Sequence, residues 1–291
     1  MLFSLAAKNR IELPSDDPAF ASLDSLCLQY QNFTSLDDFL RYYLIGFEVL
    51  LTASDFEFLT YEHVKNAYAQ TVRHTEVFFD PQAHIALGVS YQTLLSVSEM
   101  LSHGHFEDGI LIGFGMSSTE VGRYPSLYSS VYATLREADV ENLTAHYGEE
   151  GPPEYVAAAM SDLGVKRIDH GRRAIEDQSL FRRLVDAKIM LTVCPISNVM
   201  LKGVQDIMNL PIRHFLDLGV RFSINSDDPA YFGGSLLDNY CAIQEAFDLS
   251  MADWKDIARN SVEGSWCSEG RKMDLKNMID RAFADVIIPN N

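Results

Sequence analysis

The second half of the chain alternates short apolar segments with helical segments, and this order restricts the possible folds more than any other feature. From Asp162 onward the order is strand, helix, strand, helix, which predicts a parallel sheet with outer helices. Several strand segments are apolar on both faces, as parallel strands covered by helices must be. The predicted strands are Arg73–Pro81, Gly109–Met116, Val140–Glu149, Val165–Gly171, Lys188–Pro195 and Val220–Asp228.

Helix start and stop residues lie between these strands, and the N-terminal third is mostly helical. Pro152 and Pro153 precede a helix that Gly164 ends, and Asp177 is a plausible N-cap of the next one. Two long amphipathic segments, 35–51 and 60–72, predict helices before the first strand. The predicted strands number six, two short of a closed eight-stranded α/β barrel.

The length and charge of the chain restrict its partners. A chain of 291 residues with 47% hydrophobic residues is long enough for one α/β barrel, so we expect a single domain over residues 1–291. The formal charge of −18 repels phosphate backbones and anionic membranes, so we expect neither nucleic acid nor a membrane as partner. A small neutral or cationic substrate suits this charge.

The cysteines and the N-terminus predict a cytoplasmic protein, and the nucleus is kept as a possible second location. No two of the four cysteines are close enough in sequence for a zinc knuckle or a redox pair, which fits a reducing compartment. Among them, Cys194 is interpreted as a buried strand residue and not as a nucleophile. The apolar N-terminal run is interrupted by Lys8 and is a poor signal peptide. No run approaches the ~18 apolar residues of a membrane span.

Ionisable residues follow several predicted strands at the end where barrel enzymes place their working groups. Taken singly, each has a structural explanation, such as a turn or a helix cap for an Asp pair before Pro. Taken together, they are hard to explain by packing, because a charge at a buried strand end needs a partner or a metal. These residues are His146, Glu149, His170, Asp227 and Asp228, with Cys194, Ser197 and Asn198 at a further strand end.

Four segments closely resemble the adenosine/adenine deaminase family of metal-dependent hydrolases. They are "HYGEEGPPEY", "RIDHG", "VCPISNVML" and "NSDDPAYFGG", and the resemblance runs from about Phe39 to about Trp266. The segments "RHTEVFFDPQAH", "EEGPPEYV" and "INSDDPAYFGG" resemble the adenine deaminase branch.

The resemblance implies a zinc-dependent (β/α)8 barrel that hydrolyses the exocyclic amine of adenine to give hypoxanthine and ammonia in purine salvage. His146 and Asp227 match the family's zinc ligands, and Glu149 matches its proton donor. His170 matches the histidine beside the attacking water, and Asp228 matches the carboxylate that holds the purine.

The chain also departs from the family pattern, and we expect an incomplete barrel whose first and third βα units are missing or shortened. The family's first strand carries a His-x-His pair that completes the zinc site, and no such strand precedes the N-terminal helix here. Ser117 also replaces an expected acidic residue. His103 and His105 form a His-x-His in a segment typical of a loop, so we interpret them as solvated and not as ligands.

Three readings of the function therefore remain open. The chain is an adenine deaminase, a shortened non-catalytic relative, or a deaminase that acts on adenosine or an N6-substituted adenine nucleotide. A zinc deaminase of the cytidine type is excluded because the chain has no Pro-Cys-x-x-Cys motif. The oligomeric state does not follow from the sequence.

Overall fold

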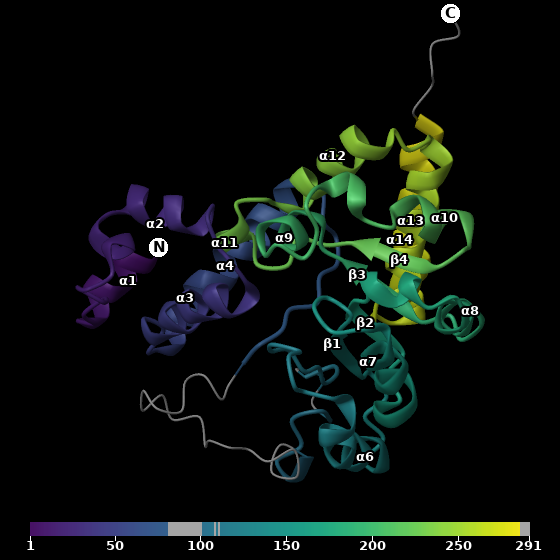
Figure 1. The fold of residues 1–291 in the computed structure, drawn as a ribbon, viewed down its shortest axis with the longest axis horizontal. Coiled ribbons are helices and arrows are strands. Elements are labelled where there is room, and N and C mark those ends of the chain that lie inside the picture. The colour runs from purple at the N-terminus through teal and green to yellow at the C-terminus, as the bar shows by residue number, and fades with distance from the viewer. Residues whose placement is uncertain (81–100, 108, 110, 286–291) are drawn as a thin grey trace, which may run out of the picture.

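The structure is a computed structural model that describes residues 1–80, 101–107, 109 and 111–285. Within these residues, four parallel strands form one sheet in the order β1-β2-β3-β4 (Figure 1). The strands are β1 (Thr144–Tyr147), β2 (Arg167–His170), β3 (Met190–Val193) and β4 (Arg221–Ile224). The α/β class is thus confirmed, and four strands are half of a closed (β/α)8 barrel.

The register of the sheet brings the carboxyl ends of the strands to one edge. His146 is level with Asp169, and Tyr147 is level with His170 on the neighbouring strand. Val193 at the end of β3 is likewise level with Ile224 at the end of β4. Residues that follow the four strands therefore meet on one side of the sheet.

Helices cover the sheet as the strand–helix alternation predicts. Gln178–Asp186 forms α8, and Asp177 caps it by accepting the backbone N–H groups of Ser179 and Leu180, as expected. Gly164, in the left-handed region at φ 68°, ends the helical segment after β1. The other helices after β1 are α7 (Pro153–Ala158) with a π-helical turn (Ala159–Leu163), α9 (Pro195–Met200), α10 (Ile212–Asp217), α11 (Pro229–Phe232), α12 (Leu236–Phe247), α13 (Met251–Gly264) and α14 (Glu269–Asp285).

The main core lies between the sheet and these helices. Strand residues Ile168, Leu191 and Phe222 are completely buried, and Phe222 packs on Phe215 of α10 at 5.6 Å between ring centroids. Before β1, α6 (Ser129–Glu137) adds Tyr132, whose hydroxyl donates to the Thr144 carbonyl at 2.6 Å. Burial of these large side chains is the main stabilisation of the sheet.

The N-terminal helices form a second packed unit beside α9 and α11 (Figure 1). They are α1 (Leu2–Asn9), α2 (Leu23–Tyr30), α3 (Leu36–Glu48) and α4 (Ala53–Ala69). Aromatic rings join this unit to α11: Phe39 lies 4.9 Å from Phe232, and Tyr30 lies 5.0 Å from Tyr231, between ring centroids. Across the described residues, every helix is too short or too polar to cross a bilayer.

Two of the six predicted strands differ from the structure. Residues 73–80 of the first form no strand, and Pro81 lies outside the described residues. Of the second, residues 111–116 form no strand beyond a single parallel bridge from Phe114 to Leu143, although the N–H groups of Thr144 and His146 in β1 donate to the carbonyls of Phe114 and Met116. A strand forms only where a neighbour accepts its backbone hydrogen bonds, and residues 73–80 meet their neighbours through side chains such as Glu76, which pairs with Arg167. Val77, Phe78 and Phe79 are consequently 67%, 48% and 44% exposed.

A buried carboxylate holds α1 against the start of α4. The side chain of Asp55 is 0% exposed and pairs with Lys8 at 2.5 Å. It also accepts hydrogen bonds from Asn9, from the backbone N–H groups of Leu51 and Thr52 and from the Thr52 hydroxyl. Burial by itself raises the pKa of Asp55, but these bonds outweigh it and hold the pKa well below its usual range.

We expect Asp55→Asn to lower the free energy of unfolding by about 2 kcal/mol at pH 7, because a helix cap and a buried ion pair are both lost. Since the folded pKa lies below the unfolded value of about 3.9, this stabilisation exists above pH 4 and is lost as the pH falls further. Urea denaturation at pH 7 and at pH 3 measures both effects. A difference between wild type and variant that is the same at both pH values would contradict the assignment.

Candidate active site

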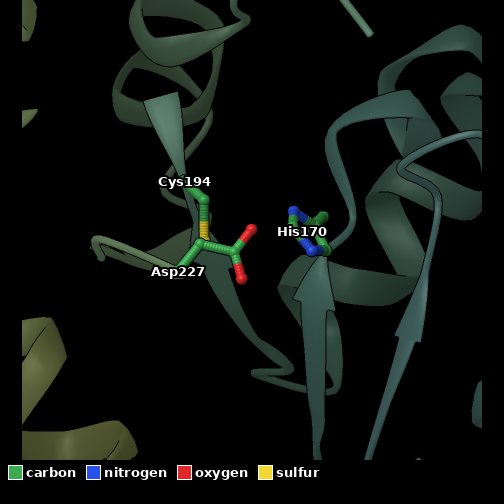
Figure 2. Close-up of side chains that lie close together, drawn as sticks. All are labelled: His170, Cys194 and Asp227. Atoms are coloured by element: carbon green, nitrogen blue, oxygen red, sulfur yellow. The ribbon is translucent and has the colours of Figure 1, made fainter. Parts of the chain in front are cut away.

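Three side chains with metal-binding atoms meet at the carboxyl edge of the sheet. His170 ends β2, Cys194 follows β3 and Asp227 follows β4, and their ligand atoms all lie within 4.8 Å of one another. Figure 2 shows the Asp227 carboxylate directed toward the His170 imidazole, with the Cys194 sulfur beside it. The imidazole of His146, from β1, lies next to this group, with its ring centroid 5.4 Å from that of His170.

Two of these residues have a backbone conformation that residues other than glycine rarely adopt. His170 has φ 66° and Asp227 has φ 56°, both in the left-handed region. Each costs about 1–3 kcal/mol, and such strain occurs preferentially at functional sites. The left-handed turn at Asp227 also explains how two neighbouring aspartates are tolerated, because it interrupts the regular strand alternation between Asp227 and Asp228.

Asp228 lies among other acidic and phenolic groups. Burial, and then the neighbouring Asp227 carboxylate, raise the pKa of Asp228 well above its usual value. The Tyr43 hydroxyl donates to Asp80 at 2.9 Å, and burial together with Asp80 and Asp228 raises the pKa of Tyr43. The protonated form of Asp228 is therefore favoured in this arrangement. Tyr231 packs against Tyr43 at 5.9 Å between ring centroids.

The ring orientation of His146 is fixed by a hydrogen bond. Its Nδ1 lies 3.0 Å from the carbonyl oxygen of Met116, which only accepts, so Nδ1 carries the proton. Asp169 Oδ2 lies 3.5 Å from the same nitrogen, and the hydroxyls of Thr144 and Thr192 each donate to Asp169 at 2.7 Å. With Nδ1 protonated, the lone pair of Nε2 is left free, which is the tautomer that binds metals.

Glu149 and His170 form a buried acid–base pair. Glu149 Oε2 lies 3.5 Å from His170 Nε2, and Glu149 Oε1 accepts a hydrogen bond from Asn198 at 3.2 Å. Burial raises the pKa of Glu149; the His170 charge opposes this and Asp227 adds to it. Burial by itself lowers the pKa of His170, but Glu149, Asp227 and Asp169 outweigh it and raise that pKa. The pair therefore retains a proton that ordinary solvent-exposed groups would release.

Asp227 and Cys194 complete the donor set. The hydroxyl of Ser197 donates to Asp227 Oδ2 at 2.6 Å and fixes that carboxylate. The Cys194 thiol contacts the Thr192 carbonyl at 3.6 Å, and burial, with Asp227 nearby, raises the pKa of the thiol. Cys194 is buried as the sequence predicts, but its position within reach of two other donors was not expected.

The structure gathers the predicted site residues at one edge without grouping them as the sequence suggested. The predicted zinc ligands are His146 and Asp227, whereas the described residues contain one group of three possible donors, in which Asp227 is joined by His170 and Cys194. The catalytic roles of Glu149, His170 and Asp228 stay predictions.

Other histidines have different surroundings. His103 and His105 stack on each other at 5.7 Å and belong to no metal-capable group in the described part of the chain. His74 pairs with Glu76 at 3.1 Å, as a structural residue would, while His84 lies outside the described residues.

Sequence reasoning missed several side chains that support the site. Asn198 contacts both Glu149 and His170, yet it was noted only as a strand-end residue. Asp169 stands directly before His170 in β2, where its regular place in the strand gave no signal. Glu120 lies between predicted elements, and its partners are backbone groups that no sequence pattern marks.

Comparison with known proteins gives the family. The sequence model "Adenosine deaminase" matches residues 1–104 and 93–282. The adenine deaminase of Aspergillus oryzae is 45% identical over 315 aligned positions, which cover 96% of this chain and 89% of that protein.

Two solved structures share the fold of this chain. The crystal structure of an adenine deaminase from Arthrobacter aurescens has a TM-score of 0.88 and 33% identity, covering 97% of this chain and 94% of that one. A Burkholderia ambifaria amidohydrolase with bound zinc shares the fold at a TM-score of 0.71 and 21% identity, over 98% of this chain and 86% of that one. From its sequence and its fold, the chain belongs to the adenosine deaminase family, in the adenine deaminase branch of these hydrolases acting on carbon–nitrogen bonds.

Proposed function

We propose that the protein deaminates adenine hydrolytically to hypoxanthine and ammonia, with zinc as its cofactor. The observation that carries this proposal is the buried Glu149–His170 pair, which lies beside the Asp227 carboxylate at the strand ends. Such a pair provides a proton donor and a proton acceptor 3.5 Å apart, and hydrolysis of an amine requires both. The adenine deaminases that the chain resembles at 45% and 33% identity support the choice of substrate.

The side chains present fit a zinc ion. Nitrogen, sulfur and carboxylate oxygen are the donors zinc prefers, and His170, Cys194 and Asp227 offer one of each within 4.8 Å of one another, with the His146 ring next to them. His146 has a free Nε2 lone pair, whereas both ring nitrogens of His170 already face polar neighbours, Glu149 and Asn198. We therefore assign His146 and Asp227 as ligands, with Cys194 as the further donor that the structure adds. When bound, zinc lowers the pKa of a coordinated water to about 7.

The remaining residues act on the substrate and on protons. Glu149, held protonated by burial, donates a proton to the ring nitrogen beside the attacked carbon. His170 accepts a proton from the attacking water as the new carbon–oxygen bond forms. The carbon–nitrogen bond to the exocyclic amine then breaks, and the amine takes up a proton and leaves as ammonia. Asp228 binds the imidazole edge of the purine and orients it.

Purine salvage and a cytoplasmic location, with the nucleus as a second location, belong to the same proposal. Adenosine and N6-substituted adenine nucleotides are the alternative substrates. Few basic side chains lie near the strand ends, Arg172 and Arg173 excepted, and these donate to the carbonyl groups of Glu149 and Glu150. Because each of these guanidinium groups already binds a backbone carbonyl of the loop around Glu149, we favour a substrate without phosphate.

Zinc binding tests the ligand assignment. We expect the purified chain to bind about one zinc, Asp227→Asn to weaken binding about 100-fold or more, and Cys194→Ser to weaken it about tenfold, because each removes one donor. Competition with a chromophoric chelator measures the affinities. Cobalt substitution adds a direct readout, since a sulfur-to-cobalt charge-transfer band appears only if Cys194 is a ligand.

Cys241→Ser is the matched control for Cys194, because Cys241 is an exposed cysteine outside the site. It should leave both the zinc affinity and the cobalt spectrum unchanged. A cobalt spectrum without the charge-transfer band would remove Cys194 from the ligand set and leave the two ligands inferred from the family resemblance.

Turnover tests the reaction. We expect ammonia release from adenine, with slower release from adenosine, and a fall in kcat of about 10³-fold in Glu149→Gln, because the proton donor is lost. Adenine loss and ammonia formation are followed together. Glu150→Gln, at a half-buried neighbouring residue, is the control and should retain most activity. Wild-type protein that binds zinc without releasing ammonia from any of these purines would favour the non-catalytic alternative.

A further inference from the structure

One buried carboxylate outside the proposed catalytic set has an unusual group of partners. Glu120 is 2% exposed and accepts hydrogen bonds from four consecutive backbone N–H groups, those of residues 148 to 151. The four donor–acceptor distances lie between 2.8 and 3.2 Å. Within the described residues Glu120 forms no salt bridge, so these N–H groups replace the water that a buried carboxylate loses.

The loop that Glu120 binds carries Glu149 into the site. Gly148 has φ 79°, a left-handed conformation that suits glycine, and turns the chain away from β1. At Gly151, a Cβ atom would lie 2.4 Å from Glu120 Oε2, so the carboxylate approaches the loop more closely than any larger residue permits. Gly151 thus leaves room for the Glu120 carboxylate, and Gly148 allows the turn that brings the loop to it.

Two backbone carbonyl groups of the same loop are also bound by side chains. Arg172 donates to the carbonyl of Glu149, and Arg173 donates to the carbonyl of Glu150. The peptide of Glu149 is therefore fixed at its N–H by Glu120 and at its carbonyl by Arg172. Only the side chain remains to be placed, and Asn198 and His170 contact its two carboxyl oxygens.

We propose that Glu120 is a positioning residue, which holds the loop 148–151 so that the Glu149 carboxyl reaches Asn198 and His170. The proposal rests on the proposed function only for its kinetic consequence. Catalytic groups must be held to within a fraction of an ångström, and a misplacement of 1 Å can cost about 10²-fold in rate. A loop outside the regular strand needs such a contact, because no ladder of backbone hydrogen bonds fixes it.

Glu120→Gln removes half of this contact without changing the size of the side chain. The amide oxygen still accepts from two N–H groups, but the amide NH2 group only donates and faces the other two N–H groups. Gly151→Ala provides a second variant that keeps the charge of Glu120 and displaces its carboxylate by steric contact. If Glu120→Gln fails to fold, Gly151→Ala tests the same contact.

Two measurements test the position of the loop without any need for turnover. Amide hydrogen exchange of a peptide that ends at Pro153 reports the four N–H groups, because the two prolines that follow them have no amide hydrogen. We expect exchange about tenfold or more faster in Glu120→Gln. The Asn198 side-chain amide signal, identified with Asn198→Ala in 15N-asparagine-labelled protein, should move toward its position in Glu149→Ala.

A double-mutant cycle tests the kinetic consequence. We expect Glu120→Gln to lower kcat for adenine about 10²-fold with KM nearly unchanged, and to have almost no further effect in a Glu149→Gln background. A merely structural role of Glu120 would instead lower kcat by the same factor in the wild-type and Glu149→Gln backgrounds. Inactive wild-type protein with the expected exchange and Asn198 shifts would refute the proposed function while supporting the positioning role.

Asp55→Asn is the matched control, since Asp55 is another buried carboxylate that accepts backbone N–H groups, but it lies in the N-terminal helices. It should lower stability without altering the exchange of residues 148–151 or the Asn198 signal. Unchanged exchange and an unchanged Asn198 signal in both Glu120→Gln and Gly151→Ala would overturn the proposal, as would equal kinetic losses with and without the Glu149 carboxyl.

Discussion

The parallel pairing of β1 to β4 is the constraint on which the rest of the structure depends. Parallel strands in register end together, so the groups that follow β1, β2, β3 and β4 share one edge of the sheet. That edge is largely buried, and each buried ionisable group on it needs a partner. Met116, Ser197 and Asn198 provide these partners to His146, Asp227 and Glu149, and the chemistry of the site follows from which lone pairs remain free.

The proposed site residues lie on short irregular segments of backbone that follow the regular strands. His170 and Asp227 both lie in the left-handed region, where their side chains leave the strand alternation and turn toward each other (Figure 2). Glu149 belongs to a loop that is held through its peptide groups by Glu120 and Arg172. In each case a rigid element fixes a short strained or curved segment, and that segment directs the side chain.

Two segments before β1 differ in how well they pack near the ends of the four-stranded sheet. The aromatic rings of α2 and α3 pack on Tyr231 and Phe232 of α11, next to Asp228, so the N-terminal unit is tied to the strand ends. Residues 73–80 form no strand, and the side chains of Val77, Phe78 and Phe79 remain partly exposed in the described structure. An exposed apolar edge favours association with other chains, and a closed barrel avoids this by leaving no edge.

The sequence by itself determined the α/β class, four of the strands, the helices between them and the set of ionisable residues at the strand ends. These follow from hydrophobic periodicity, caps and short motifs, all of which are local. Only the tertiary structure decided that Cys194 joins His170 and Asp227, that Asn198 contacts Glu149, and that Glu120 binds the loop. Those contacts lie between residues that are tens of positions apart in the sequence, and each depends on single hydrogen bonds or on the close approach of metal-binding atoms. They follow from how the strands pair, and they leave no periodic pattern in the sequence.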